Sequence, residues 1–126
     1  MEAKKPDMVM VRRDDAELIT IDEVEGTRLT QPATVRVLAE TATMLMLEVD
    51  MPAGGASTSH QHDHESTGYV VRGSVRAQVG EAEGILTAGD GFFHPIGVIH
   101  SMTALEEGAV WLEIKSPPQR TWGQAR

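Results

Sequence analysis

The chain contains short runs of apolar residues, several of which alternate with polar residues, and turn-forming residues separate these runs. Residues 74–80 give the clearest example, because Val75, Ala77 and Val79 stand at every second position and share one face of an extended strand. Turn residues recur at intervals of roughly 8–12 residues, and no stretch combines helical apolar spacing with helix caps. The pattern predicts an all-β sandwich or barrel.

The predicted strands cover residues 17–26, 34–38, 43–51, 69–73, 74–80, 84–91, 92–97, 100–104 and 108–115. Segment 43–51 is rich in methionine and leucine and would also suit a helix, but its length and the turn at residues 52–55 favour a buried strand. Gly73 is expected to form a turn between two of the strands. Residues 1–30 are expected to form an N-terminal arm and edge strand, and residues 31–126 a barrel domain with a C-terminal tail.

Composition and charge narrow the class of protein. A length of 126 residues suits one domain, and 40% hydrophobic with 24% charged residues indicates a globular chain. The absence of cysteine excludes disulfides and thiolate metal sites. A net charge of −8 disfavours nucleic acid and anionic membranes as partners. Without a signal peptide or an apolar run of membrane-spanning length, the protein is expected to be soluble and cytoplasmic.

Three of the five histidines, His60, His62 and His64, stand at alternate positions. On a strand, a His-x-His pair offers two imidazoles to one point in space, as a metal ion requires, whereas in a polar loop the same residues would be solvated. A further histidine, His100, follows a Pro-x-Gly turn in the later part of the chain. In a barrel, a later strand can return beside the first pair, so His60, His62 and His100 are candidates for a three-imidazole site.

Together these segments resemble the two motifs of the cupin superfamily. The first is Gly54-x5-His60-x-His62, closed by Gly73, and the second is Gly89-x5-Pro95-x-Gly97-x2-His100. The resemblance covers about residues 33–120 and implies a small cupin-type jelly-roll barrel, also called a double-stranded β-helix. It also implies one divalent transition metal, such as Zn, Ni, Mn or Fe, held by His60, His62 and His100.

Within this superfamily, the histidine segment and the residues after His100 resemble the single-domain cupins of pectin degradation, which open the ring of unsaturated uronates. The resemblance places the fourth metal ligand, a glutamine in that subfamily, on Ser66. A serine is too short to reach a metal at the ~2.0–2.2 Å of a first-shell oxygen without a backbone shift, so either Ser66 or water fills this position. His64 is expected to be a turn residue or a partner behind the ligands.

The subfamily's presumed catalytic positions, an Asp, an aromatic residue and an Arg, fall on Glu113, Lys115 and Gln119. Glu113 keeps a carboxylate that can act as a general base. Lys115 replaces an aromatic sugar-packing side chain with a cation, and Gln119 lacks the guanidinium that would pair with a substrate carboxylate. Arg120, one residue further along, is a candidate to replace that guanidinium.

Two classes of function remain open. The first is a metal-dependent enzyme with Lewis-acid isomerase or lyase chemistry on a small sugar acid or related carbonyl compound, with Glu113 as the base. The second is a cupin that binds a metal or small ligand without catalysis, as a sensor or accessory protein, and a three-histidine iron dioxygenase is a weaker third. A Glu113 side chain inside the pocket favours the enzyme, and one in solvent favours the binding protein.

The remaining aromatic and histidine side chains have simpler expected roles. Tyr69, Phe92 and Phe93 are expected in the core or the pocket wall, but strand parity does not tell which of the two phenylalanines faces inward. His94 either points outward or lines the mouth of the pocket. Trp122, beyond the barrel, is a candidate to cap a partner subunit, because a homodimer formed through the N-terminal strand and the tail is expected.

Overall fold

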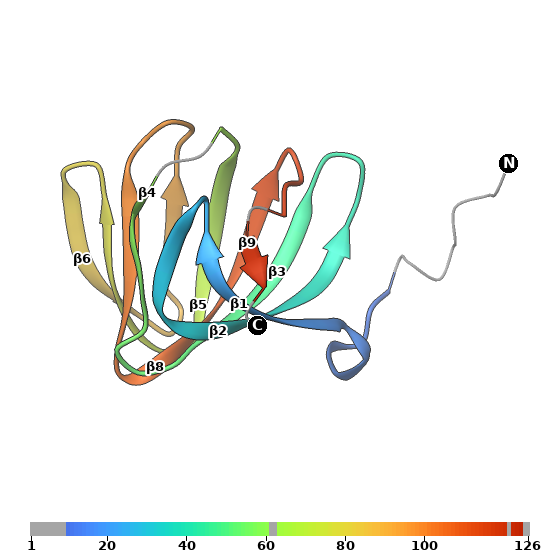
Figure 1. Ribbon diagram of the computed structural model, residues 1–126, viewed down its shortest axis with the longest axis horizontal. Coiled ribbons are helices and arrows are strands. Elements are labelled where there is room, and N and C mark those ends of the chain that lie inside the picture. The colour runs from blue at the N-terminus through green and yellow to red at the C-terminus, as the bar shows by residue number, and fades with distance from the viewer. Residues whose placement is uncertain (1–9, 61–62, 121, 125–126) are drawn as a thin grey trace, which may run out of the picture.

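The computed structural model describes residues 10–60, 63–120 and 122–124, except for the side chains of residues 58–60, 123 and 124. In this part of the chain the secondary structure consists of strands and one short 3-10 turn, η2 (Arg13–Asp15). The prediction of an all-β fold is confirmed, and the strands wrap around a common interior (Figure 1). No helix in the described ranges has the length and apolar character needed to cross a lipid bilayer.

The described residues form nine strands, which all pair in antiparallel fashion. They are β1 (Glu17–Val24), β2 (Thr27–Glu40), β3 (Leu45–Met51), β4 (Ala56–His60), β5 (Glu65–Val79), β6 (Ala82–Thr87), β7 (Gly91–His94), β8 (His100–Ser116) and β9 (Trp122–Gln124). The sheet order is β6-β5-β8-β3-β2-β1-β9, with β4 on β8 and β7 on β5. β1, expected as an edge strand, therefore pairs with β2 on one side and β9 on the other. β2 runs through residue 30, where the arm was expected to end.

Two long strands, β5 and β8, connect the two halves of the barrel. Residues 65–73 of β5 lie opposite residues 109–116 of β8, whereas residues 75–79 lie opposite residues 100–104. The first half continues from β8 into β3, and the second half joins β4 and β6. The antiparallel sheet folds over at these two bent strands, and its two halves form the predicted jelly-roll barrel.

The prediction of a turn at Gly73 is wrong, because β5 runs without interruption through this residue. The pairing of β5 with β8 shifts register between Gly73 and Val75, which marks a bulge. Gly73 has a φ of 80°, and a Cβ atom there would meet the carbonyl oxygen of Gly108 on β8, where φ is 72°. The two glycines let the backbones approach closely where both strands bend from one half of the barrel to the other.

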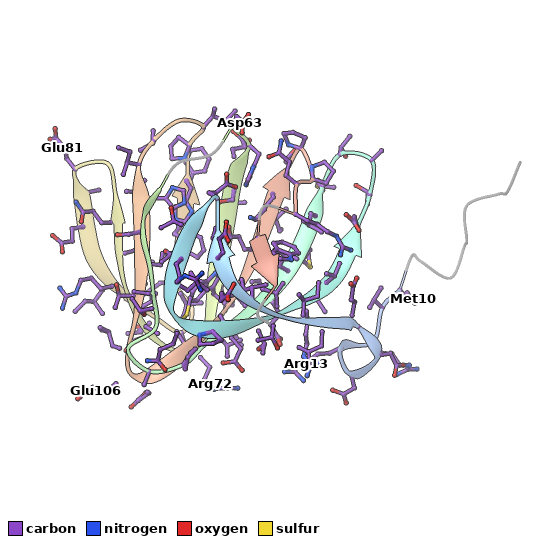
Figure 2. All side chains as sticks on the ribbon, viewed as in Figure 1. Met10, Arg13, Asp63, Arg72, Glu81 and Glu106 are labelled. Atoms are coloured by element: carbon purple, nitrogen blue, oxygen red, sulfur yellow. The ribbon has the colours of Figure 1, made fainter. Side chains whose placement is uncertain are left out.

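The core fills the interior of the barrel, and β3 shows its pattern most clearly. Leu45, Leu47, Val49 and Met51 are buried and alternate with partly exposed residues. This alternation confirms the prediction of a buried strand in place of a helix. At the ends of the barrel, charged side chains such as Arg72, Glu81 and Glu106 extend into solvent (Figure 2).

The aromatic residues of β5 and β7 divide between the two faces of the sheet. Tyr69 is 51% exposed, so the expectation that it belongs to the core or pocket wall is wrong. Phe93 is 52% exposed and is therefore the outward-facing one of the two phenylalanines. Phe92 packs against the core, because Gly68 lies opposite it on β5 and leaves room for its ring. Since side chains alternate along β7, an inward Phe92 places Phe93 outside and His94 inside.

Candidate functional site

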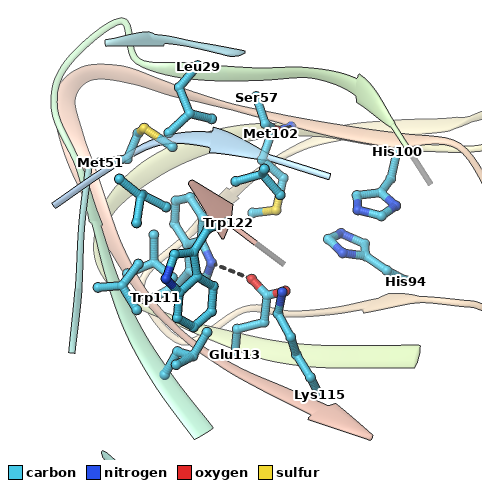
Figure 3. A pocket seen from close by; sticks show the side chains of 15 residues that line it. Leu29, Met51, Ser57, His94, His100, Met102, Trp111, Glu113, Lys115 and Trp122 are labelled. Atoms are coloured by element: carbon cyan, nitrogen blue, oxygen red, sulfur yellow. Dashed lines mark hydrogen bonds between the residues drawn. The ribbon is translucent and has the colours of Figure 1, made fainter. Parts of the chain in front are cut away.

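A cavity of about 60 Å³ lies inside the barrel and has one polar and one apolar side (Figure 3). The polar side is formed by His94, His100, Glu113 and Lys115. The other described lining residues are Ser57 and a set of apolar side chains, namely Ile21, Val24, Leu29, Val35, Leu47, Val49, Met51, Met102, Trp111 and Trp122. The arrangement places charged and titratable groups against an otherwise apolar interior.

Two histidines stack at the polar side. The rings of His94 and His100 have centroids 3.8 Å apart and an interplanar angle of 15°. The Nδ1 atom of His100 lies 3.1 Å from the carbonyl oxygen of Val98, which can only accept, so this nitrogen carries the proton. In the neutral ring the lone pair is then on Nε2, which is the arrangement that a metal-binding histidine requires.

The predicted three-histidine site lies only partly within the described residues. β4 pairs with β8 so that the backbone of His60 is opposite that of His100. The side chain of His60 and the whole of His62 lie outside the described residues. Among the side chains that are described, no group of three or more metal-binding residues is close enough to hold an ion. The pairing of β4 with β8 brings together the two segments that carry the predicted ligands.

Ser66 and His64, the other two candidates from the histidine segment, are both buried. Ser66 is 1% exposed and its Oγ atom lies 3.2 Å from Nδ1 of His94, with which it forms a hydrogen bond. His64 forms a hydrogen bond between its Nδ1 atom and Oε1 of Gln119, 3.0 Å away. The histidine segment therefore contacts His94 through Ser66 and the C-terminal segment through His64.

Glu113 lies on the inner face of β8 and lines the cavity, as expected of a candidate base. Trp111 donates a hydrogen bond of 3.1 Å from Nε1 to Oε1 of Glu113. Burial by itself would raise the pKa of the Glu113 carboxyl, but the charge of Lys115 and the field of His94 oppose it. With the hydrogen bond from Trp111 and a smaller effect of His100, these interactions hold the pKa of Glu113 below its ordinary value. Glu113 is therefore a carboxylate at neutral pH.

Lys115 follows two residues later on the same inner face and is 4% exposed. Its Nζ atom lies 5.7 Å from the centre of the Trp122 ring, a cation–π contact. Trp122 belongs to β9, which pairs with β1, and its side chain lines the cavity. Trp122, which the sequence placed beyond the barrel as a candidate cap on a partner subunit, thus contacts the cavity of its own chain.

Arg120 does not line the cavity. Its Nη2 atom forms ion pairs with Oε1 of Glu40 at 2.8 Å and with Oε1 of Glu17 at 3.2 Å. These contacts attach the C-terminal segment to β1 and β2. Gln119 forms its hydrogen bond with His64. With Arg120 outside the cavity, Lys115 is the one lysine or arginine among the described lining residues.

The inward position of His94 is the feature that the sequence left open. A signal was present, because Gly68 and Phe92 pair across β5 and β7 and a glycine opposite an aromatic residue leaves space for its ring. That pairing fixes the face of Phe92 and therefore that of His94. The pairing of Gly68 with Phe92 can be recognised only when the register of β5 and β7 is known.

Comparisons with known proteins agree with this architecture. The model of the cupin domain family matches residues 47–115. The pectin degradation protein KdgF of Dickeya dadantii (strain 3937) is 32% identical over 75 residues, which are 59% of this chain and 68% of that protein. The solved structure of KdgF from Halomonas sp. superposes with a TM-score of 0.67 at 28% identity, covering 70% of this chain and 81% of that one.

A second solved structure, an RmlC-like cupin from Shewanella frigidimarina NCIMB 400, superposes with a TM-score of 0.74. It covers 88% of this chain and 92% of that one, and at 23% identity this likeness shows the shared fold. Both structural matches cover more of the chain than the two motifs do.

Proposed function

Since the chain belongs to the cupin family, as the match over residues 47–115 shows, we propose that it is a metal-dependent enzyme with isomerase- or lyase-type chemistry on a small acid that carries a carbonyl or hydroxyl group. The observation that carries this proposal is the position of Glu113 inside the barrel cavity, on the same side as two imidazoles and Lys115. A carboxylate in this position favours catalysis over simple binding.

The metal would be held by His60, His62 and His100. Two observations support a fit, namely the pairing of His60 with His100 across β4 and β8 and the bond from His100 Nδ1 to Val98, which places the lone pair of the neutral ring on Nε2. Since the Ser66 hydroxyl bonds His94, a water or a substrate oxygen takes the fourth position in this proposal. Zinc, nickel, manganese and iron all suit imidazole ligands, and such a cation polarises a substrate oxygen and acidifies bound water.

Glu113 is assigned the role of general base. Trp111 holds Oε1 through its indole N–H, which orients the carboxylate, and Oε2 is the atom that would accept a proton. The lowered pKa of Glu113 keeps the carboxylate ionised at neutral pH, so the base is available without prior deprotonation. The positive charge of Lys115 would stabilise the negative charge that develops on the substrate when this proton leaves.

The test is the exchange of the C3 protons of 2-oxobutyrate with solvent deuterium, followed by proton NMR with the metal-loaded protein. We expect wild-type protein to accelerate exchange and the Glu113→Gln variant to lose about 10²–10⁴-fold of that acceleration, because the amide cannot take the proton. Glutamine keeps an acceptor for Trp111, so the variant should retain its metal and its fold. Binding of the acid without exchange would contradict the enzyme and indicate a non-catalytic cupin.

A further inference from the structure

The cavity described above has a wall that suits an alkyl chain better than a sugar. Away from the polar side, the lining consists of aliphatic and aromatic side chains such as Leu29, Val49, Met51 and Trp111. A sugar acid carries a hydroxyl on nearly every carbon, and each hydroxyl that loses water without gaining a partner costs binding energy. The polar groups of the described apolar wall are the hydroxyl of Ser57, whose Oγ atom already accepts a hydrogen bond from the Met102 amide, and the indole N–H groups of Trp111 and Trp122, of which that of Trp111 is donated to Glu113.

Lys115 supplies the charge that a carboxylate would need. It is the one lysine or arginine among the described lining residues, is 4% exposed, and lies over the Trp122 ring. Inside an apolar cavity, an ammonium group attracts an anion more strongly than at the surface.

We propose that the cavity binds a 2-hydroxy or 2-oxo acid with an alkyl chain, with its carboxylate on Nζ of Lys115 and its alkyl chain against Val49 and Trp111. The position of the 2-hydroxy or 2-oxo group beside Glu113 and the metal rests on the proposed function. The binding of the carboxylate by Lys115 does not, because it requires only the side chains that line the cavity. The proposed function and the carboxylate site can therefore fail separately.

The experiment is isothermal titration calorimetry of the full chain, first without metal and then loaded with zinc. The probes are 2-hydroxybutyrate, its neutral amide 2-hydroxybutyramide, and galacturonate. We expect the metal-free protein to bind 2-hydroxybutyrate about tenfold or more tightly than the amide or galacturonate. Lys115→Met should remove this preference, whereas Lys115→Arg should retain most of it because a cation remains.

Arg76→Met is the matched control, because it removes one positive charge from an exposed ion pair with Glu83 on β5 and β6. It should bind 2-hydroxybutyrate as the wild-type protein does. If Lys115→Met does not fold, the test rests on the affinities of the wild-type protein and of Lys115→Arg for 2-hydroxybutyrate, its amide and galacturonate. Undetectable binding of 2-hydroxybutyrate, tighter binding of galacturonate, or equal affinities in wild type and Lys115→Met would each overturn the proposal, whatever the metal content or exchange rate.

Discussion

His94 and His100 stack face to face, with ring centroids 3.8 Å apart, although one ends β7 and the other begins β8. Each ring is also held from a second direction, His94 by the hydroxyl of Ser66 and His100 by the carbonyl of Val98. A ring fixed by both a stack and a hydrogen bond has little freedom to rotate. The orientation of His100, the proposed metal ligand, therefore depends on its neighbour.

Replacing His94 by alanine should weaken metal binding without abolishing it. The change removes the stacked ring and the partner of Ser66, so His100 loses part of its fixed orientation, and we expect a 10–100-fold loss of zinc affinity at an unchanged stoichiometry. Competition with a chelating dye measures this affinity. Ser66→Ala, which removes the hydrogen bond and keeps both rings, should cost less. An unchanged affinity in His94→Ala would show that the stack has no part in orienting His100.

Lengthening residue 66 should have the opposite effect. Ser66→Gln adds an amide oxygen on an inward-facing position of β5, directly opposite His94 in the strand pairing, so we expect tighter zinc binding in the same assay. Thr67→Gln, one residue along and facing outward, serves as the control and should leave the affinity unchanged. If both variants match the wild-type protein, residue 66 lies beyond the reach of the metal.

Gly73→Ala should destabilise the barrel by about 2–4 kcal/mol, from a strained positive φ and a clash with the Gly108 carbonyl. Urea unfolding followed by tryptophan fluorescence gives the free energy of unfolding. Gly84→Ala on β6 is the matched control, because a Cβ there meets nothing within 4 Å. It should change stability by less than about 1 kcal/mol. Equal effects of the two substitutions would refute the close approach of β5 and β8.

The ion pair between Glu40 and Arg120 should stabilise the fold at neutral pH and lose its effect in acid. The hydrogen bond from Arg120 lowers the pKa of Glu40 below its ordinary value of 4.5, against the opposing effect of burial. A carboxyl whose pKa is lower in the folded state stabilises that state above the pKa of the unfolded chain, and the gain disappears as pH falls through the lowered value. The wild-type protein should therefore be more stable than Glu40→Gln at pH 7, and the difference should shrink below pH 4.5. A gap in urea midpoints that is independent of pH would contradict this assignment.

Local patterns were sufficient to predict the class of fold and the inner face of several strands. The alternation of Val75, Ala77 and Val79 and the buried run of β3 follow from side-chain geometry alone. The spacing of two motifs indicated the family, and the position of Glu113 in the cavity agreed with its suggested role.

Contacts between distant strands could not be predicted in the same way. Gly73 is typical of a turn until Gly108 is known to lie against it, and the inward one of Phe92 and Phe93 cannot be chosen until Gly68 is known to lie opposite Phe92. Trp122 follows the last clear strand in the sequence, and only its pairing with β1 brings it over Lys115. Each of these features depends on a pairing register, which a single sequence does not specify.

The most direct test of the central claim, a metal centre on His60, His62 and His100, is the metal content of purified protein reloaded with zinc and measured by elemental analysis. We predict about one divalent ion per chain for the wild-type protein. His60→Ala and His100→Ala should lose the ion, and His64→Ala, which removes a buried partner of Gln119, should retain it. A folded wild-type protein that takes up no metal, or a His100→Ala variant that retains a full equivalent, would contradict the claim.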